Sequence, residues 1–176
     1  MIEKIRRVVT GHDDSGKSVF IFDGDAGAVM EMESMPGLAL TDLWVTDSSP
    51  ADNIGNTDAT DRPIVLEPPA NGTIFRVVEF PPDSAWRDNA DAKEAFGSIG
   101  ADHATDDSSD DAMMHKTSTV DYLIVLKGEI WAILDDSETC LKQGDVMVQR
   151  GTNHSWSVRT NEPCLLAAIL VDSAPV

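Results

Sequence analysis

The chain has 176 residues, a length that suits one domain, and 41% of them are hydrophobic, enough to bury a core. Its 31 acidic residues against 13 Lys and Arg give a net charge of -18, which disfavours binding to nucleic acid and to anionic membranes. No apolar run approaches the ~20 residues that span a bilayer, and residues 1–10 lack the apolar core of a secretion signal. We therefore expect a cytoplasmic protein with no nucleic-acid or membrane partner.

The two cysteines, Cys140 and Cys164, lie in apolar or strand-like sequence. Their spacing is not that of a metal site, so the sequence predicts buried free thiols rather than a disulfide or a zinc pair. Free thiols agree with a reducing cytoplasm.

The first half of the chain contains three runs that are typical of strands, at Ser18–Phe22, Leu38–Val45 and Thr73–Phe80. The third is stopped by Pro81-Pro82, which cannot continue a hydrogen-bonded ladder. Residues 47–63 are rich in Asp, Asn, Ser, Gly and Pro, and predict a long surface loop rather than a domain linker.

Two further segments precede the second half. Trp86–Ile99 is the best candidate for a short helix, although its hydrophobic period is weak. Residues 101–111 are dense in Asp and Ser, which predicts a mobile acidic loop that keeps the surface soluble. A calcium site is disfavoured there because the spacing of an EF-hand and its closing Glu are missing.

From Thr117 onward the sequence predicts a regular series of short strands separated by turns. The predicted strands are Thr119–Leu126, Glu129–Leu134, Val146–Gln149, His154–Val158 and Leu165–Val171. Strands and turns at intervals of roughly 8 to 12 residues indicate an all-β sandwich or barrel and not a βαβ fold.

Polar residues alternate along the start of this region, at His115, Thr117, Thr119 and Asp121. Side chains on a strand alternate between its two faces, so these four should point the same way. The same face continues with apolar residues, Leu123 and Val125. A barrel face that is polar at one end and apolar along the rest is typical of a strand that lines a pocket.

A second polar anchor is His154, which follows the turn Gly151-Thr152-Asn153 and shares the face of Trp156. Two His and one carboxylate on a rigid barrel form a facial triad that leaves open positions on a metal ion. The sequence therefore predicts that His115, Asp121 and His154 hold a divalent metal. Each of the three could instead be a hydrogen-bonded structural residue.

The stretch HKTSTVDYLIVLKG, residues 115–128, resembles the first motif of the cupin superfamily, which is His-x-His, three or four residues, Glu, six residues and Gly. His115, Thr117, Asp121 and Gly128 fall on its four positions. The stretch GDVMVQRGTNHSWSV, residues 144–158, resembles the second cupin motif, with Gly144, Gly151 and His154 at corresponding positions.

The chain departs from both motifs. Thr117 replaces a metal-binding His, and Asp121 replaces the longer Glu. Ser109 stands where a leading Gly is usual, Arg150 with one residue deleted replaces a Pro-x-Gly turn, and Val158 replaces a final Asn. The chain thus resembles small bacterial cupins with a degenerate metal motif.

The resemblance implies a double-stranded β-helix, or jelly-roll barrel, with a short helix and an N-terminal strand arm. It also implies one domain over 1–176, with N-terminal strands and loops at 1–114 and the motifs at 115–171. Cupins bind iron, manganese, nickel or zinc, and in this chain such an ion could be held partially or be absent. Thr117, Gln149 and Trp156 are expected around the ion, as part of the pocket or supporting its ligands.

Two functions remain open. The first is a metal-dependent enzyme that acts on a small organic molecule, as a dioxygenase, decarboxylase, isomerase or lyase. The second is a binding or sensor protein that holds a small ligand without metal or chemistry. Either form is expected to be a homodimer, in which residues 6–10 add a strand to a neighbouring subunit.

Overall fold

The computed structural model describes residues 1–89, 91–106 and 108–176. In these ranges the chain is built mainly from β-strands, as the sequence predicts. The strands are β1 (Arg6–His12), β2 (Ser18–Asp25), β3 (Ala28–Glu31), β4 (Ala39–Thr46), β5 (Thr73–Phe80), β6 (Thr119–Lys127), β7 (Glu129–Ile133), β8 (Glu138–Lys142), β9 (Val146–Arg150), β10 (Ser155–Ser157) and β11 (Cys164–Asp172). The helical elements are η1 (Asp83–Ala85), η2 (Arg87–Asn89), α1 (Ala92–Ser98) and η3 (Asp102–Ala104).

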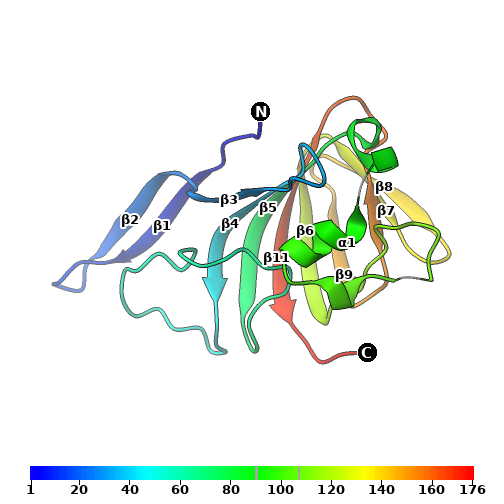
Figure 1. The fold of residues 1–176 in the computed structure, drawn as a ribbon. Helices are drawn as coiled ribbons and strands as arrows, with labels where there is room; N and C mark the ends of the chain where they lie inside the picture. Colours follow the sequence, from blue (N-terminus) through cyan, green and yellow to red (C-terminus); the bar gives the residue numbers. More distant parts are fainter. Residues whose placement is uncertain (90, 107) are drawn as a thin grey trace.

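Two antiparallel sheets form the barrel (Figure 1). The larger has the order β3-β4-β5-β11-β6-β9, and the smaller has the order β10-β7-β8. One core cluster lies between them and is built from buried side chains of both sheets, including Leu123, Ile130, Val158 and Leu166. Burial of such side chains contributes about 1.5–3 kcal/mol each.

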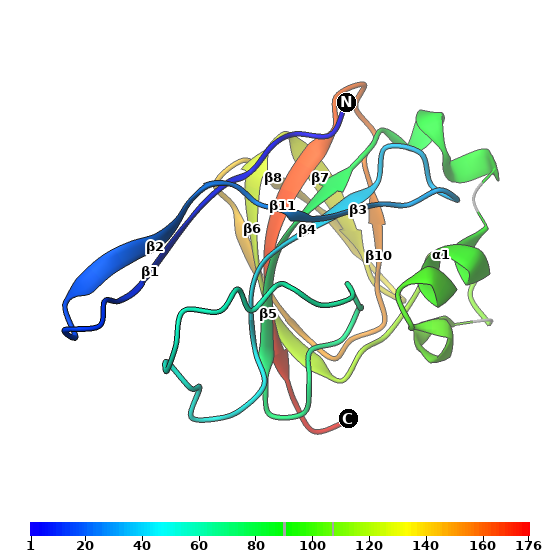
Figure 2. The same ribbon diagram turned by 60° about the vertical axis from the view of Figure 1, so that its left-hand side comes forward.

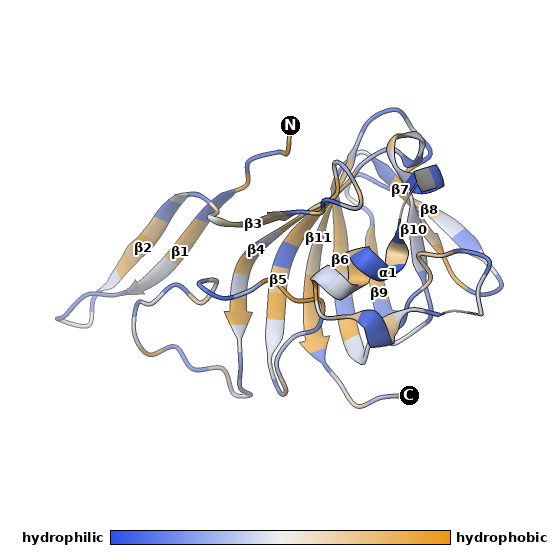
Figure 3. Cartoon of the chain, in the orientation of Figure 1, coloured by the Kyte–Doolittle hydropathy of each residue, from blue (hydrophilic) through white to orange (hydrophobic). Residues whose placement is uncertain are grey.

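The strand β6 shows the alternation that the sequence predicts. Leu123 and Val125 are buried, whereas Tyr122 and Leu126 are exposed on the other face. Figure 3 shows apolar residues repeating along β6 and its neighbours. The turn that follows needs Gly128, whose φ is +79° and whose missing Cβ would lie 2.8 Å from the carbonyl oxygen of Pro163.

The predicted N-terminal strand arm is present, but it pairs within its own chain. β1 and β2 form a separate antiparallel hairpin that projects away from the barrel (Figures 1 and 2). Its exposed apolar side chains include Val8 and Phe20. One edge of β1 is therefore already filled by β2, and only its other edge is open to a neighbouring subunit.

The predicted helix over Trp86–Ile99 is shorter than expected. The α-helix covers only Ala92–Ser98, and it begins at Asp91, whose side chain accepts a hydrogen bond from the Glu94 backbone N–H at 3.0 Å. Residues before it form single 3₁₀ turns, and residue 90 lies outside the described residues. Ala95 and Phe96 are the buried side chains of α1, which explains the weak hydrophobic period.

Residues 101–111 form a loop, as predicted, with the short turn η3 inside it, but this loop packs against the barrel. Residue 107 lies outside the described residues. Ala101 and Ala104 are buried in the core cluster next to α1. Thr105 forms a β-bridge with His115, and Asp111 pairs with Arg87 at 2.6 Å. Because small alanines interrupt the acidic run, the segment can pack against the barrel despite its charge.

Sequence patterns missed the strands β3 and β8, which are short and partly exposed. Residues 47–63 form the predicted loop, visible below the hairpin in Figure 2. Asp58 anchors this loop by an ion pair with Arg7 of β1. Cys164 is buried, Cys140 is partly buried, and both are free thiols, as predicted. No helix in the described ranges is long and apolar enough to span a membrane.

Candidate functional site

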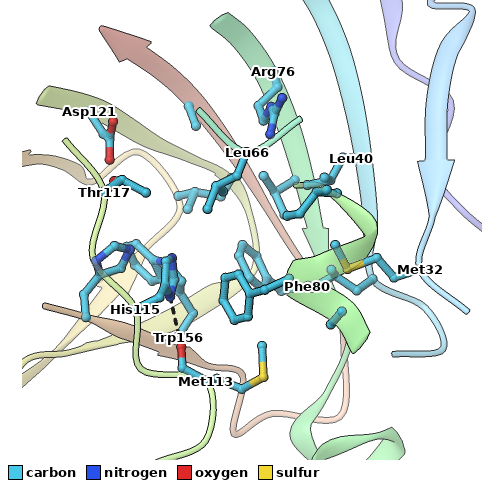
Figure 4. A pocket seen from close by; sticks show the side chains of 18 of the residues that line it. Met32, Leu40, Leu66, Arg76, Phe80, Met113, His115, Thr117, Asp121 and Trp156 are labelled. Atoms are coloured by element: carbon cyan, nitrogen blue, oxygen red, sulfur yellow. Dashed lines mark hydrogen bonds between the residues drawn. The ribbon is translucent and has the colours of Figure 1, made fainter. Parts of the chain in front are cut away.

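A cavity of about 130 Å³ lies inside the barrel. Of the described residues that line it, six are polar: Arg76, His115, Thr117, Asp121, Gln149 and His154. The others are apolar or aromatic, and Figure 4 shows Met32, Leu40, Leu66 and Phe80 among them. The cavity is thus a mainly apolar space with a few convergent polar groups, which is typical of a small-molecule site.

The cavity is closed on one side by α1 and the segments around it. Phe96 of α1 packs against His115, with ring centroids 4.8 Å apart. Trp86 and Ile99, on either side of the helix, also line the cavity. The helix α1, which is shorter than the sequence predicts, therefore forms part of the cavity wall.

His115 and His154 lie side by side at the polar end. Their backbones exchange two hydrogen bonds of 2.9 Å, so their side chains project on the same face. The ring centroids are 4.0 Å apart. This confirms that the two histidines are neighbours and that both face the cavity.

Both imidazoles are held in one tautomer. His115 Nδ1 lies 2.9 Å from the Met113 carbonyl oxygen, and His154 Nδ1 lies 2.9 Å from the Thr152 carbonyl oxygen. A carbonyl oxygen only accepts hydrogen bonds, so Nδ1 must carry the proton in each ring. The lone pair is then on Nε2. Burial lowers the pKa of His115, and burial together with His115 lowers the pKa of His154 well below its usual value.

Gln149 joins His154 to Asp121. Its side-chain nitrogen lies 3.0 Å from Asp121 Oδ2 and 3.0 Å from His154 Nε2. The opposite orientation of the amide would place its oxygen against a carboxylate oxygen and a nitrogen lone pair, so the amide N–H groups donate to both. Gln149 stands opposite Asp121 in the register of β6 and β9.

The two threonines of this face support Asp121. Thr117 Oγ1 and Thr119 Oγ1 are 2.8 Å apart, and the Thr119 hydroxyl hydrogen-bonds the Asp121 carboxylate. Burial nevertheless raises the pKa of Asp121, against the lowering effects of Thr119, Gln149 and Arg76. The hydroxyl of Thr117 therefore contacts Thr119, the residue that precedes Asp121 on the same face of the strand.

Arg76 is the one cationic side chain among the described residues that line the cavity. It is 2% exposed, and its Nε lies 2.9 Å from Oδ1 of the buried Asp42. Its Nη2 donates to the Val65 carbonyl oxygen at 2.7 Å. Burial lowers the pKa of Arg76 and raises the pKa of Asp42.

Sequence reasoning missed this ion pair, although a signal was present. Arg76 alternates with Ile74 and Val78 in β5, so it falls on the inward face. Asp42 occupies the same kind of position in β4, next to Leu40, and it stands directly opposite Arg76. A charged residue at an inward position on each of two adjacent predicted strands indicates a buried pair.

The other predicted pocket residues lie where the sequence places them. Gln149 and Trp156 line the cavity, and Trp156 contacts His154 with ring centroids 5.8 Å apart. Arg150, the neighbour of Gln149 in β9, is exposed.

A divalent metal fits the donor chemistry of the predicted ligands. His115 and His154 are anchored at Nδ1 and present Nε2, which is the usual arrangement of metal-binding histidines. Asp121 brings a buried oxygen, Oδ1, that has no hydrogen-bond partner. Among the described residues, however, no three His, Cys, Asp or Glu side chains gather into a metal-binding group, and Gln149 lies between Asp121 and His154. The metal site stays a prediction.

Comparisons with known proteins place the chain among fungal relatives. It is 32% identical over 164 residues to "Phomopsin biosynthesis cluster protein D" of Diaporthe leptostromiformis, covering 88% of this chain and 71% of that protein. It is 28% identical over 180 residues to "Cupin-domain-containing oxidoreductase virC" of Hypocrea virens, covering 97% of this chain and 77% of that protein. No family model matches the chain.

Among solved structures, the cupin domain of Schizosaccharomyces pombe Cnp3 aligns with a TM-score of 0.44 and 13% identity, over 98% of this chain and 86% of that chain. The matches to the sequence relatives span most of the chain, and the predicted two-sheet barrel is present. The chain belongs to the cupin superfamily.

Proposed function

We propose that the chain is a cupin enzyme that acts on a small organic molecule in the barrel cavity, with a divalent metal ion held by His115, Asp121 and His154. The observation that carries the proposal is the pair of adjacent, singly protonated imidazoles at the polar end of an otherwise apolar cavity. Relatives named cupin-domain-containing oxidoreductases favour a redox reaction.

In this proposal some residues bind the substrate, and others position the metal ligands. The apolar wall binds the body of the substrate and excludes water, which strengthens polar interactions at the other end. The Met113 and Thr152 carbonyls fix the two imidazole planes. A bound divalent ion would supply Lewis-acid or redox chemistry at its open positions.

A binding protein without metal is the second candidate, and one observation favours it. Gln149 donates to His154 Nε2 and to Asp121 Oδ2, so a side chain of the protein itself satisfies two of the proposed metal ligands. In that case the same cavity would hold a ligand without chemistry.

Metal analysis separates the two candidates. We expect protein purified without a His tag to contain a divalent metal, and His115→Ala, Asp121→Ala and His154→Ala each to weaken its binding by about ten-fold or more. Elemental analysis after dialysis against a metal mixture measures this.

The matched control is Tyr122→Phe, because Tyr122 neighbours Asp121 in β6 but is exposed on the opposite face. It should keep the metal content of the wild type. A wild type that remains metal-free under these conditions contradicts the enzyme proposal in its metal-dependent form.

We also propose that the chain forms a homodimer through the outer face of the larger sheet. Val148, Tyr122, Ile169 and Phe75 stand in one row across β9, β6, β11 and β5, by the strand registers. Three of them are exposed. An apolar row of this kind beside the projecting hairpin favours contact with a second copy.

Light scattering tests the assembly. The wild type should have twice the mass of the chain, and Val148→Lys combined with Phe20→Lys should shift it toward the monomer, because two charges would then be buried at the interface. Deletion of residues 1–10 should act in the same direction. A wild type that is monomeric at high concentration contradicts the proposal.

A further inference from the structure

Apart from the Arg76 guanidinium, which is paired with Asp42, the side chains around the cavity leave hydrogen-bond acceptors unused and few donors. Each histidine donates its single ring N–H to a backbone carbonyl oxygen, so neither ring can donate a hydrogen bond to a ligand in the cavity. His154 Nε2 accepts from Gln149, whereas His115 Nε2 has no partner among the described side chains.

The remaining polar side chains around the cavity also use hydrogen-bond donors on other protein groups. The Gln149 amide gives its two N–H groups to Asp121 and His154. The Thr117 and Thr119 hydroxyls lie 2.8 Å apart, and one of them donates to the other. The Gln149 N–H groups and one threonine hydroxyl are therefore used inside the wall of the cavity.

Two buried side-chain oxygens in this hydrogen-bond network have no donor in the described part of the chain. Asp121 Oδ1 and Gln149 Oε1 have no hydrogen-bond partner among the described residues. Both side chains line the cavity together with His115. Buried acceptors without partners cost free energy, and that cost is removed when a ligand donates to them.

The charges at this end disfavour an anionic ligand. Arg76 is already paired with Asp42, and the Asp121 carboxylate also acts on it. A ligand carboxylate would therefore add a third acidic group around a single guanidinium. Like charges in a space of low dielectric repel strongly.

The volume limits the size of the ligand. A cavity of about 130 Å³ is close to the roughly 150 Å³ of an apolar cavity that accepts benzene. One ring, or an aliphatic body of similar size, would fill it.

We propose that the metal-free cavity binds a small apolar molecule whose polar group is a neutral hydroxyl, which donates its one hydrogen to one of the acceptors His115 Nε2, Asp121 Oδ1 and Gln149 Oε1. Two of these atoms would be ligands of the proposed metal ion, so this inference rests on the proposed function only in using the same cavity. A hydroxyl matches the unused acceptors, and an apolar body matches the rest of the wall.

Binding of three single-ring probes tests the proposal. Phenol and toluene have nearly the same shape, and they differ by a hydroxyl in place of a methyl group, whereas benzoate carries a negative charge. Titrations of the full-length chain after dialysis against EDTA, followed through the indole N–H signals of Trp86 and Trp156 in NMR spectra, give the three affinities. The EDTA step keeps metal ions off the same lone pairs.

We expect phenol to bind at least about ten-fold more tightly than toluene and than benzoate, since an unpaired buried hydroxyl would instead weaken binding by about ten-fold. Toluene binding as well as phenol would overturn the proposal, and so would tighter binding of benzoate, which would indicate Arg76 as an anion anchor. Failure of phenol to bind at millimolar concentration would overturn it too.

Variants assign the effect to the polar end. His115→Phe keeps a ring against Phe96 but removes one acceptor, and it should reduce the preference for phenol over toluene. Tyr122→Phe should leave the preference unchanged. Metal content is measured on the same preparations before EDTA. A metal-free protein that still prefers phenol contradicts the enzyme proposal in its metal-dependent form and leaves the hydroxyl proposal standing.

Discussion

Arg76→Met should destabilise the protein by about 3–5 kcal/mol at pH 7, because it leaves the Asp42 carboxylate buried without its partner. Both side chains are nearly inaccessible, at 2% and 3% exposure, and their closest nitrogen and oxygen atoms are 2.9 Å apart. Methionine fills most of the volume of the arginine stem, so the loss of charge pairing dominates. Urea unfolding followed by tryptophan fluorescence measures the change in the free energy of unfolding.

The double variant Asp42→Leu/Arg76→Met is the matched control. Replacing a buried ion pair by apolar side chains of similar volume is often neutral or stabilising, so this variant should recover most of the loss. The deficit of the single variant should also shrink as the pH falls, because burial already raises the pKa of Asp42 and protonation removes the unpaired charge. A single variant as stable as the wild type would show that Asp42 is not charged in the native protein.

The strand pattern of the second half could be predicted because each strand is bounded by turn residues and alternates in polarity. Thr119–Leu126 and Leu165–Val171 match β6 and β11 to within one residue at each end. The strand β8, in contrast, has the sequence ETCLK, with few apolar residues and an exposed position. Backbone pairing with β7 defines this strand, and its own sequence has no alternating pattern.

The polar end of the site could also be predicted, because parity and motif register both placed His115, Asp121 and His154 on the inward face. All three line one cavity. The apolar end could not, since its side chains come from segments with no regular period. Met32 and Met35 follow β3 in a turn, and Phe96 belongs to a helix of seven residues. Their convergence depends on tertiary packing alone.

Sequence patterns could not predict the hydrogen bonds that Gln149 makes between Asp121 and His154. Gln149 could be placed in the pocket by its position beside the second motif, but its bonds to Asp121 and His154 follow from the β6–β9 register. That register sets Gln149 between two residues that the motif resemblance treats as direct ligands of one ion. The donor count that supports a hydroxyl ligand follows from the same bonds.

The stability of the EDTA-treated protein should fall as the pH is lowered from 7 through 6.5 and below. Burial lowers the pKa of His115 and His154 in the native state. Below pH 6.5 the unfolded chain therefore binds protons that the native chain does not, and the free energy of unfolding decreases with falling pH. Each histidine can contribute a slope of up to about 1.4 kcal/mol per pH unit.

Variants isolate this contribution from that of the buried acids, which acts in the opposite direction because burial raises the pKa of Asp42 and Asp121. His154→Phe removes the more deeply buried imidazole and should reduce the slope the most, by about 1 kcal/mol per pH unit. His115→Phe should reduce it less, since His115 is only partly buried. Urea unfolding at intervals from pH 5 to 7.5 measures the slopes, and equal slopes for the wild type and both pocket variants would mean that the native histidines take up protons as freely as the unfolded chain.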